Sequence, residues 1–93
     1  MTYIKICGIT NAGDAIESVR LGCHYLGFVF AKSSPRYIEP ESARNIVRLI
    51  GSDVKTVGVF TQESDEVIEI MNLCNLDYAQ LHGGQSEDFA DKI

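Results

Sequence analysis

The sequence predicts an α/β fold built on a parallel sheet. Short apolar runs begin near residues 3, 25, 56 and 78, and a segment with helical periodicity follows each of them. Strands that alternate with helices in this way pair in parallel through right-handed crossovers. Because the chain has 93 residues and 45% of them are hydrophobic, we expect residues 1–93 to form a single domain around one core.

The first βα unit opens with residues 3–7, a predicted buried strand that ends at Gly8. Asn11 is a suitable N-cap for the helix that follows, and Asp14 in its first turn favours the positive end of the helix dipole. Gly22 ends this helix. Apolar residues recur on one face of it at helical spacing: Ala12, Ala15, Ile16 and Val19.

The second unit has a strand at residues 26–30, whose continuous hydrophobicity is typical of parallel strands. A polar loop, residues 32–36, follows the strand. Pro40 fits the first turn of the next helix, which Gly51 ends. The apolar positions of this helix are Ala43, Ile46, Val47 and Ile50.

The third unit has a strand at residues 56–60 and a helix that begins after Ser64. The apolar positions of that helix are Val67, Ile70, Met71 and Cys74. The fourth strand is predicted at residues 78–82. We expect a turn at Gly83-Gly84 and a further helix from Ser86 onwards.

Two architectures fit four consecutive βα units: an open sheet of the flavodoxin type, or half of a (β/α)8 barrel. In both, ligands bind at the carboxyl ends of the strands. The residues predicted there are Cys7-Gly8, Ser34-Pro35-Arg36, Phe60-Thr61 and His82-Gly83. The flavodoxin type is the weaker alternative, because no loop is glycine-rich enough to wrap a flavin phosphate.

Composition excludes several classes of function. A net charge of −5 has the wrong sign for a nucleic-acid-binding surface, and the longest apolar run, Leu26 to Ala31, is far below the ~18 residues of a membrane span. The three cysteines, at positions 7, 23 and 74, fit reduced thiols in the cytoplasm better than a disulfide framework. No Cys, His and carboxylate residues have metal-ligand spacing, so we expect neither a metal nor a cofactor.

Four sequence blocks, in this order, resemble those of the phosphoribosylanthranilate isomerase family. They are Lys5-Ile6-Cys7-Gly8-Ile9-Thr10, Gly27-Phe28-Val29-Phe30 with Ser34-Pro35-Arg36-Tyr37, Val57-Gly58-Val59-Phe60, and Gln80-Leu81-His82-Gly83. The resemblance covers nearly the whole chain. It implies a parallel (βα)4 half of a TIM (β/α)8 barrel and the family's reaction in tryptophan biosynthesis. That reaction is the Amadori rearrangement of N-(5-phosphoribosyl)anthranilate, an aldose-to-ketose isomerisation.

The resemblance implies that Cys7 is the general base that removes a proton from C2 of the sugar. A thiol in this role must be partly ionised, and positive potential nearby stabilises the thiolate. Lys5 shares the strand face of Cys7, and the first helix begins just beyond Gly8. Without the motif, a small buried apolar cysteine would be the more common situation.

Three further residues are candidates for substrate binding. Arg36, in a strand-to-helix loop, suits the carboxylate of the anthranilate group; the alternative is a solvated surface arginine. Gln80 and His82 share one face of the fourth strand and should point into the barrel lumen. For His82 the alternative is a hydrogen-bonded structural histidine, and we interpret His24 as part of the surface structure.

The chain is shorter than a complete barrel, which needs at least ~200 residues. The family's general acid is an aspartate on its fifth strand, and its phosphate site is built from late loops, so we expect these 93 residues alone to have little or no isomerase activity. The predicted lumen-facing side chains of Val57, Val59 and Gln80 should be exposed, and the first and fourth strands should be unpaired edges. The open alternatives are the N-terminal half of an isomerase and a non-catalytic half-barrel. In the second, the chain pairs with its own copy or with a C-terminal half.

Overall fold

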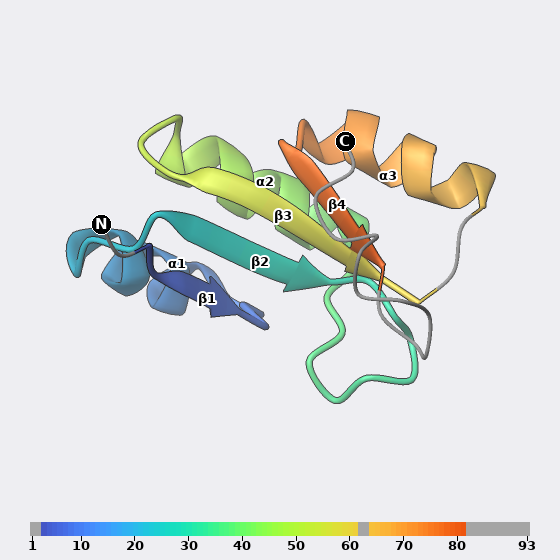
Figure 1. Ribbon diagram of the computed structural model, residues 1–93, viewed down its shortest axis with the longest axis horizontal. Helices are drawn as coiled ribbons and strands as arrows, with labels where there is room; N and C mark the ends of the chain where they lie inside the picture. Colours follow the sequence, from blue (N-terminus) through green and yellow to red (C-terminus); the bar gives the residue numbers. More distant parts are fainter. Residues whose placement is uncertain (1–2, 62–63, 82–93) are drawn as a thin grey trace.

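A computed structural model describes residues 3–61 and 64–81 and shows four strands and three helices in that part of the chain (Figure 1). All four strands are parallel and neighbour one another in chain order, β1-β2-β3-β4. The elements are β1 (Lys5–Cys7), α1 (Ala12–Arg20), β2 (Tyr25–Val29), α2 (Pro40–Ile50), β3 (Lys55–Phe60), α3 (Asp65–Cys74) and β4 (Tyr78–Leu81).

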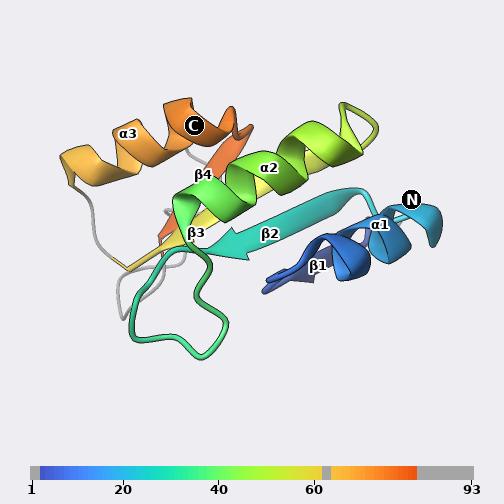
Figure 2. The ribbon, with the colours of Figure 1, turned by 180° about the vertical axis from the view of Figure 1, so that it is seen from behind.

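The three helices all cover the same face of the sheet. In Figure 1 the strands lie in front of the helices, and in Figure 2, seen from behind, the helices lie in front of the strands. A doubly wound open sheet has helices on both faces and a strand order that departs from the chain order. Strands in chain order with helices on one face are the winding of a (β/α)8 barrel, so the predicted half-barrel is confirmed and the flavodoxin type is excluded.

The core lies between the helices and the sheet face that they cover. Leu26 and Phe28 of β2 are both 0% exposed and lie in one apolar cluster with Ala15 of α1, Ala43 of α2 and Ile70 of α3. The predicted helix ends also hold. The Asn11 side chain accepts a hydrogen bond from the backbone N–H of Asp14 at 2.8 Å, as an N-cap does.

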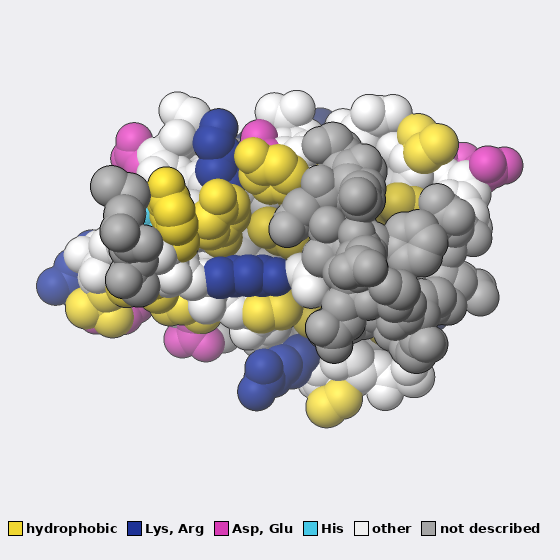
Figure 3. Space-filling view, viewed as in Figure 1, with side chains coloured by type: hydrophobic (Ala, Val, Ile, Leu, Met, Phe, Trp, Pro, Cys, Tyr) yellow, Lys and Arg dark blue, Asp and Glu magenta, His cyan; other side chains and the backbone are white. Residues whose placement is uncertain are grey.

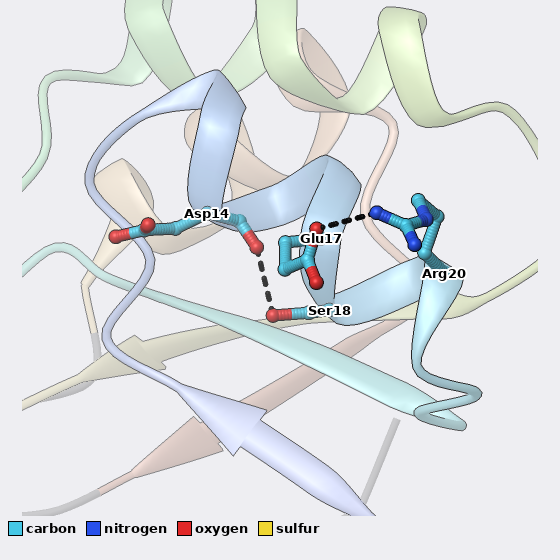
Figure 4. Close-up of polar contacts among 4 residues, drawn as sticks. All are labelled: Asp14, Glu17, Ser18 and Arg20. Atoms are coloured by element: carbon cyan, nitrogen blue, oxygen red, sulfur yellow. Dashed lines mark hydrogen bonds and ion pairs between the residues drawn. The ribbon is translucent and has the colours of Figure 1, made fainter.

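The buried face of α1 differs from the prediction at two positions. Ile16 is 44% exposed, and Ser18 is buried in its place. The Ser18 hydroxyl donates a hydrogen bond to the backbone carbonyl of Asp14 at 2.8 Å, so burial leaves it satisfied (Figure 4). The Glu17–Arg20 ion pair of the same helix, 2.9 Å, is exposed to solvent.

The prediction of a buried first strand is wrong. β1 covers only Lys5–Cys7, and both Lys5 and Cys7 are exposed, because β1 is an edge of the described sheet and no helix covers the face that these two side chains share. β4 is the other edge, as predicted.

The predicted exposure of Val57 and Val59 is also wrong, since they are 3% and 7% exposed. The rings of Tyr25 on β2 and Tyr78 on β4 lie 6.2 Å apart between centroids, on the two strands that flank β3 and its residue Val57. Gln80, next to Val59 in the strand register, is partly buried.

Some predictions lie outside the described residues: His82, the Gly83-Gly84 turn and the helix from Ser86. None of the helices in residues 3–61 and 64–81 is long and apolar enough to cross a membrane.

The core model predicts very different costs for two leucine truncations. Leu26→Ala removes a side chain that is 0% exposed and should lower the free energy of unfolding by about 2–5 kcal/mol. Leu49→Ala, the matched control on α2, removes a side chain that is 59% exposed and should change it by less than about 0.5 kcal/mol. Urea unfolding followed by circular dichroism measures both, and equal midpoints for the two variants would contradict this core.

Candidate active site

A hollow of about 470 Å³ lies on the open face of the sheet, towards the carboxyl ends of the strands. Figure 3 views the molecule from this face. Three of the four predicted site residues, Cys7, Arg36 and Gln80, line this one hollow, and the fourth, His82, lies outside the described residues. The lining residues are Lys5, Cys7, Val29, Ala31, Ser33, Ser34, Arg36, Val59, Thr61 and Gln80.

Cys7 is the last residue of β1, and its side chain is placed by a glycine on the neighbouring strand. A Cβ atom on Gly27 would lie 3.0 Å from Cys7 Sγ and 3.3 Å from Cys7 Cα, so any larger residue would force the thiol to shift. The backbone N–H groups of Gly8 and Ile9 both donate to the Gly27 carbonyl, at 3.0 and 3.1 Å. These bonds fix the turn that ends β1 with the Cys7 thiol exposed.

The other two cysteines are buried in the apolar cluster. Burial raises the pKa of the Cys23 thiol, and burial together with the nearby carboxylate of Glu41 raises the pKa of the Cys74 thiol. Cys74 Sγ donates to the Pro40 carbonyl at 3.2 Å. The neutral thiols therefore make their full contribution to the free energy of unfolding below the ordinary thiol pKa of about 8.5. This contribution is lost as the pH rises through the raised pKa values of Cys23 and Cys74.

Arg36 reaches the same hollow from the loop after β2. Its backbone N–H donates to Ser34 Oγ at 3.0 Å, which shapes the loop. Its side chain lies against Gly8, where an added Cβ atom would be 2.5 Å from Arg36 Cδ and 3.0 Å from Nη1. Gly8 also has φ +90°, a conformation that favours glycine, so this position needs glycine for two reasons.

Lys5 and Gln80 join the two edges of the described sheet across its open face. Lys5 Nζ on β1 donates a hydrogen bond to Gln80 Oε1 on β4, with β2 and β3 between them. Neighbouring strands are about 4.8 Å apart, so a flat sheet would separate β1 from β4 by about 14 Å. The side chains meet because the sheet is concave, as a barrel wall is.

The hollow combines positive charge with an apolar floor. Lys5 and Arg36 line it, and none of its described lining residues carries a carboxylate, although the chain as a whole has a net charge of −5. Val29, Ala31 and Val59 supply the apolar surface. Such a site suits an anionic ligand with an apolar part. No group of three or more His, Cys, Asp or Glu in the described part of the chain is arranged to hold a metal ion.

Two other features lie at the amino ends of the strands, the end where barrels carry stability. A second hollow, about 460 Å³, is lined by residues of α2 and α3 that include Arg44 and Arg48. His24 accepts a hydrogen bond at Nδ1 from the backbone N–H of Ile4, 3.0 Å away, which agrees with its predicted place in the surface structure.

Ser34 and Thr61 were predicted at the carboxyl ends of the strands and both line the hollow, whereas the contact of Gly27 with Cys7 was not predicted. A glycine inside an otherwise apolar strand was an available signal for Gly27, because it often marks a close approach of another group. The position of Ser34 and Thr61 after strand ends was the signal for their place at the hollow, but nothing in the sequence assigned a role to either hydroxyl.

Comparison with known proteins reveals a consistent similarity. Residues 4–93 match the family model described as N-(5'phosphoribosyl)anthranilate (PRA) isomerase. The N-(5'-phosphoribosyl)anthranilate isomerase of Chlorobium phaeobacteroides is 57% identical over 83 residues, which are 88% of this chain and 38% of that protein. The isomerase of Syntrophus aciditrophicus is 44% identical over 100% of this chain and 41% of its own length. The chain thus spans about 40% of the length of these relatives.

Solved structures agree with this similarity. The phosphoribosyl anthranilate isomerase of Thermotoga maritima superposes with a TM-score of 0.88 at 41% identity, covering 96% of this chain and 44% of that one. A phosphoribosyl anthranilate isomerase solved with reduced 1-(o-carboxyphenylamino)-1-deoxyribulose 5-phosphate superposes with a TM-score of 0.86 at 40% identity, covering 96% of this chain and 46% of that one.

The contrast between the cysteines predicts selective labelling. At pH 8 a thiol reagent such as DTNB should react within minutes with Cys7, which is exposed, and only after denaturation with Cys23 and Cys74, which are buried. Peptide mapping by mass spectrometry identifies the labelled residue, and Cys7→Ser is the control that should abolish the fast phase. A fast phase that persists in Cys7→Ser would contradict the placement of the three thiols.

Proposed function

The chain belongs to the N-(5'-phosphoribosyl)anthranilate isomerase family, and from this premise we propose that it forms the amino-terminal half of an isomerase barrel. The proposed reaction is the Amadori rearrangement of N-(5'-phosphoribosyl)anthranilate in tryptophan biosynthesis, in the cytoplasm. The observation that carries the proposal is the convergence of Cys7, Arg36 and Gln80 on one cationic hollow at the carboxyl ends of the strands.

Cys7 is the proposed general base. Once the ribose ring has opened to a protonated imine, the thiolate takes the proton from C2 of the sugar. The C–H electron pair then forms the C1–C2 double bond, the imine electrons move to nitrogen, and the resulting enolamine becomes the ketose by proton transfer. The exposed position of Cys7 at the strand end gives a substrate access to its sulfur. The proton for ring opening comes from the family's acid on the fifth strand, beyond the four strands described here.

Arg36 is the proposed partner of the anthranilate carboxylate. A guanidinium binds a carboxylate through two parallel hydrogen bonds, and Arg36 lies against Gly8, directly after Cys7. The compound bound in the solved relative carries such a carboxylate on an aromatic ring. In this chain Val29, Ala31 and Val59 offer that ring an apolar surface, and we propose that Gln80 and His82 bind the sugar.

The second candidate function is a non-catalytic half-barrel that acts only by association. The observation that favours it is the pair of edge strands, β1 and β4, in the described sheet. A second copy of the chain or a carboxyl-terminal half-barrel would pair with these edges. One solved structure of this family comes from an isomerase of Thermotoga maritima that is described as dimeric.

A chimera tests the catalytic proposal. Residues 4–81 replace the matching part of the Thermotoga maritima isomerase, and turnover of N-(5'-phosphoribosyl)anthranilate is measured. Cys7→Ala should lower kcat by about 10²- to 10⁴-fold, because the base is lost. Arg36→Ala should raise KM by about 10- to 100-fold, because a charge-assisted pair is lost.

Arg48→Ala is the matched control, because Arg48 is an exposed arginine on α2 away from the hollow, and its kinetics should match the unmodified chimera. Full turnover by the Cys7→Ala chimera would refute the base assignment. Light scattering of the 93-residue chain tests the association function, for which a dimer is expected and a stable monomer is the contrary result.

A further inference from the structure

We propose that Lys5 is a positioning residue, which sets the orientation of the Gln80 side-chain amide so that Gln80 donates a hydrogen bond to the sugar part of the substrate. This inference deepens the proposed function and rests on it. The observation behind it is the Lys5–Gln80 hydrogen bond, which spans the concave face from β1 to β4 beside Cys7 and Arg36.

The chemistry of the two groups fixes the orientation of the amide. A lysine ammonium has only N–H donors, so it binds the oxygen of a glutamine amide and not its nitrogen. Gln80 Oε1 accepts from Lys5 Nζ, and the amide nitrogen therefore points away from Lys5. Within residues 3–61 and 64–81, no hydrogen bond uses this nitrogen, and the proposal assigns its N–H donors to a ligand.

The hollow then presents donors to a ligand from two side chains, the Arg36 guanidinium and the Gln80 amide nitrogen, while the Lys5 ammonium donates to Gln80 Oε1. Arg36 lies over the turn at Gly8, whereas Gln80 belongs to the opposite edge strand. A ligand that places its carboxylate on Arg36 therefore extends across Cys7 towards Gln80. The group that meets Gln80 is an oxygen of the sugar, which accepts the hydrogen bond that the fixed amide donates.

Lys55, a second lysine on the same sheet face, does not bond to Gln80 among the described residues, so the position of Lys5 along the barrel determines this contact. Lys5 and Lys55 both pair in register with Tyr25, one from each side of β2. Strand stagger in a barrel raises Lys5 to the height of Gln80. Lys55 lies at the amino ends of the strands, lines two hollows there and is not among the described lining residues of the hollow beside Cys7, so it provides a matched control.

The test uses the chimera and two readouts, the kinetic constants and the Kd for reduced 1-(o-carboxyphenylamino)-1-deoxyribulose 5-phosphate. Gln80→Glu retains an oxygen for Lys5 but loses the N–H donors, and Gln80→Leu loses both. Each should raise KM and Kd by about three- to tenfold, with kcat within about twofold. Lys5→Met should raise KM and Kd by a smaller factor, because the amide can then rotate.

A double-mutant cycle tests whether Lys5 acts through Gln80. In the Gln80→Leu background, Lys5→Met should have no further effect on KM or Kd. Lys55→Met should behave like the unmodified chimera, and the urea midpoint of each variant shows whether it is folded.

Three results would overturn the inference: normal binding by Gln80→Glu, an undiminished effect of Lys5→Met in the Gln80→Leu background, or equal losses from Lys5→Met and Lys55→Met. In each case an unmodified chimera that binds and turns over leaves the proposed function intact. An unmodified chimera that neither binds the analogue nor turns over the substrate would overturn the proposed function and this inference together.

Discussion

The parallel pairing of consecutive strands in chain order is the constraint on which the rest of this structure depends. Right-handed crossovers then place every described helix on the same face of the sheet, and the strands curve around the opposite face. Curvature has a direct chemical consequence, because it brings side chains of the two edge strands within hydrogen-bonding distance. Parallel pairing also gathers the carboxyl ends of all four strands at one rim, where strands and loops both supply polar side chains to the hollow.

Two glycines, Gly8 and Gly27, leave space at this rim for the side chains of Arg36 and Cys7. Gly8 and Gly27 lie on neighbouring strands, and each gives up its side-chain volume to a functional group of another segment: Arg36 at Gly8 and Cys7 at Gly27. Any larger residue at either position would displace the arginine or the thiol. The absence of side chains at Gly8 and Gly27 thus leaves the space in which the proposed base, Cys7, and the proposed carboxylate partner, Arg36, lie close together.

The regular part of the fold could be read from the sequence because it depends on local chemistry. Pro40, Gly51 and the Asn11 cap mark helix ends through backbone geometry that these residues impose themselves. The errors arose where packing between elements decides. Ser18 can be buried because its hydroxyl donates a hydrogen bond within its own helix, a contact that hydrophobic periodicity does not take into account. In the site, Cys7 and Arg36 came from a resemblance, whereas the Lys5–Gln80 bond depends on the curvature of the sheet, which sequence spacing does not encode.

The two ends of the concave face differ in how their side chains are packed. Towards the amino ends of the strands, Tyr3, Tyr25 and Tyr78 form a series of ring contacts, and Val57 on β3 is buried. Towards the carboxyl ends the chain places lysine, arginine and an exposed thiol around an open hollow. Packing at one end holds the strands in the curvature that the other end needs, because the Lys5–Gln80 contact exists only in a concave sheet. The two ends of the concave face therefore differ already in these four strands, with packed rings at the amino ends and an open polar hollow at the carboxyl ends.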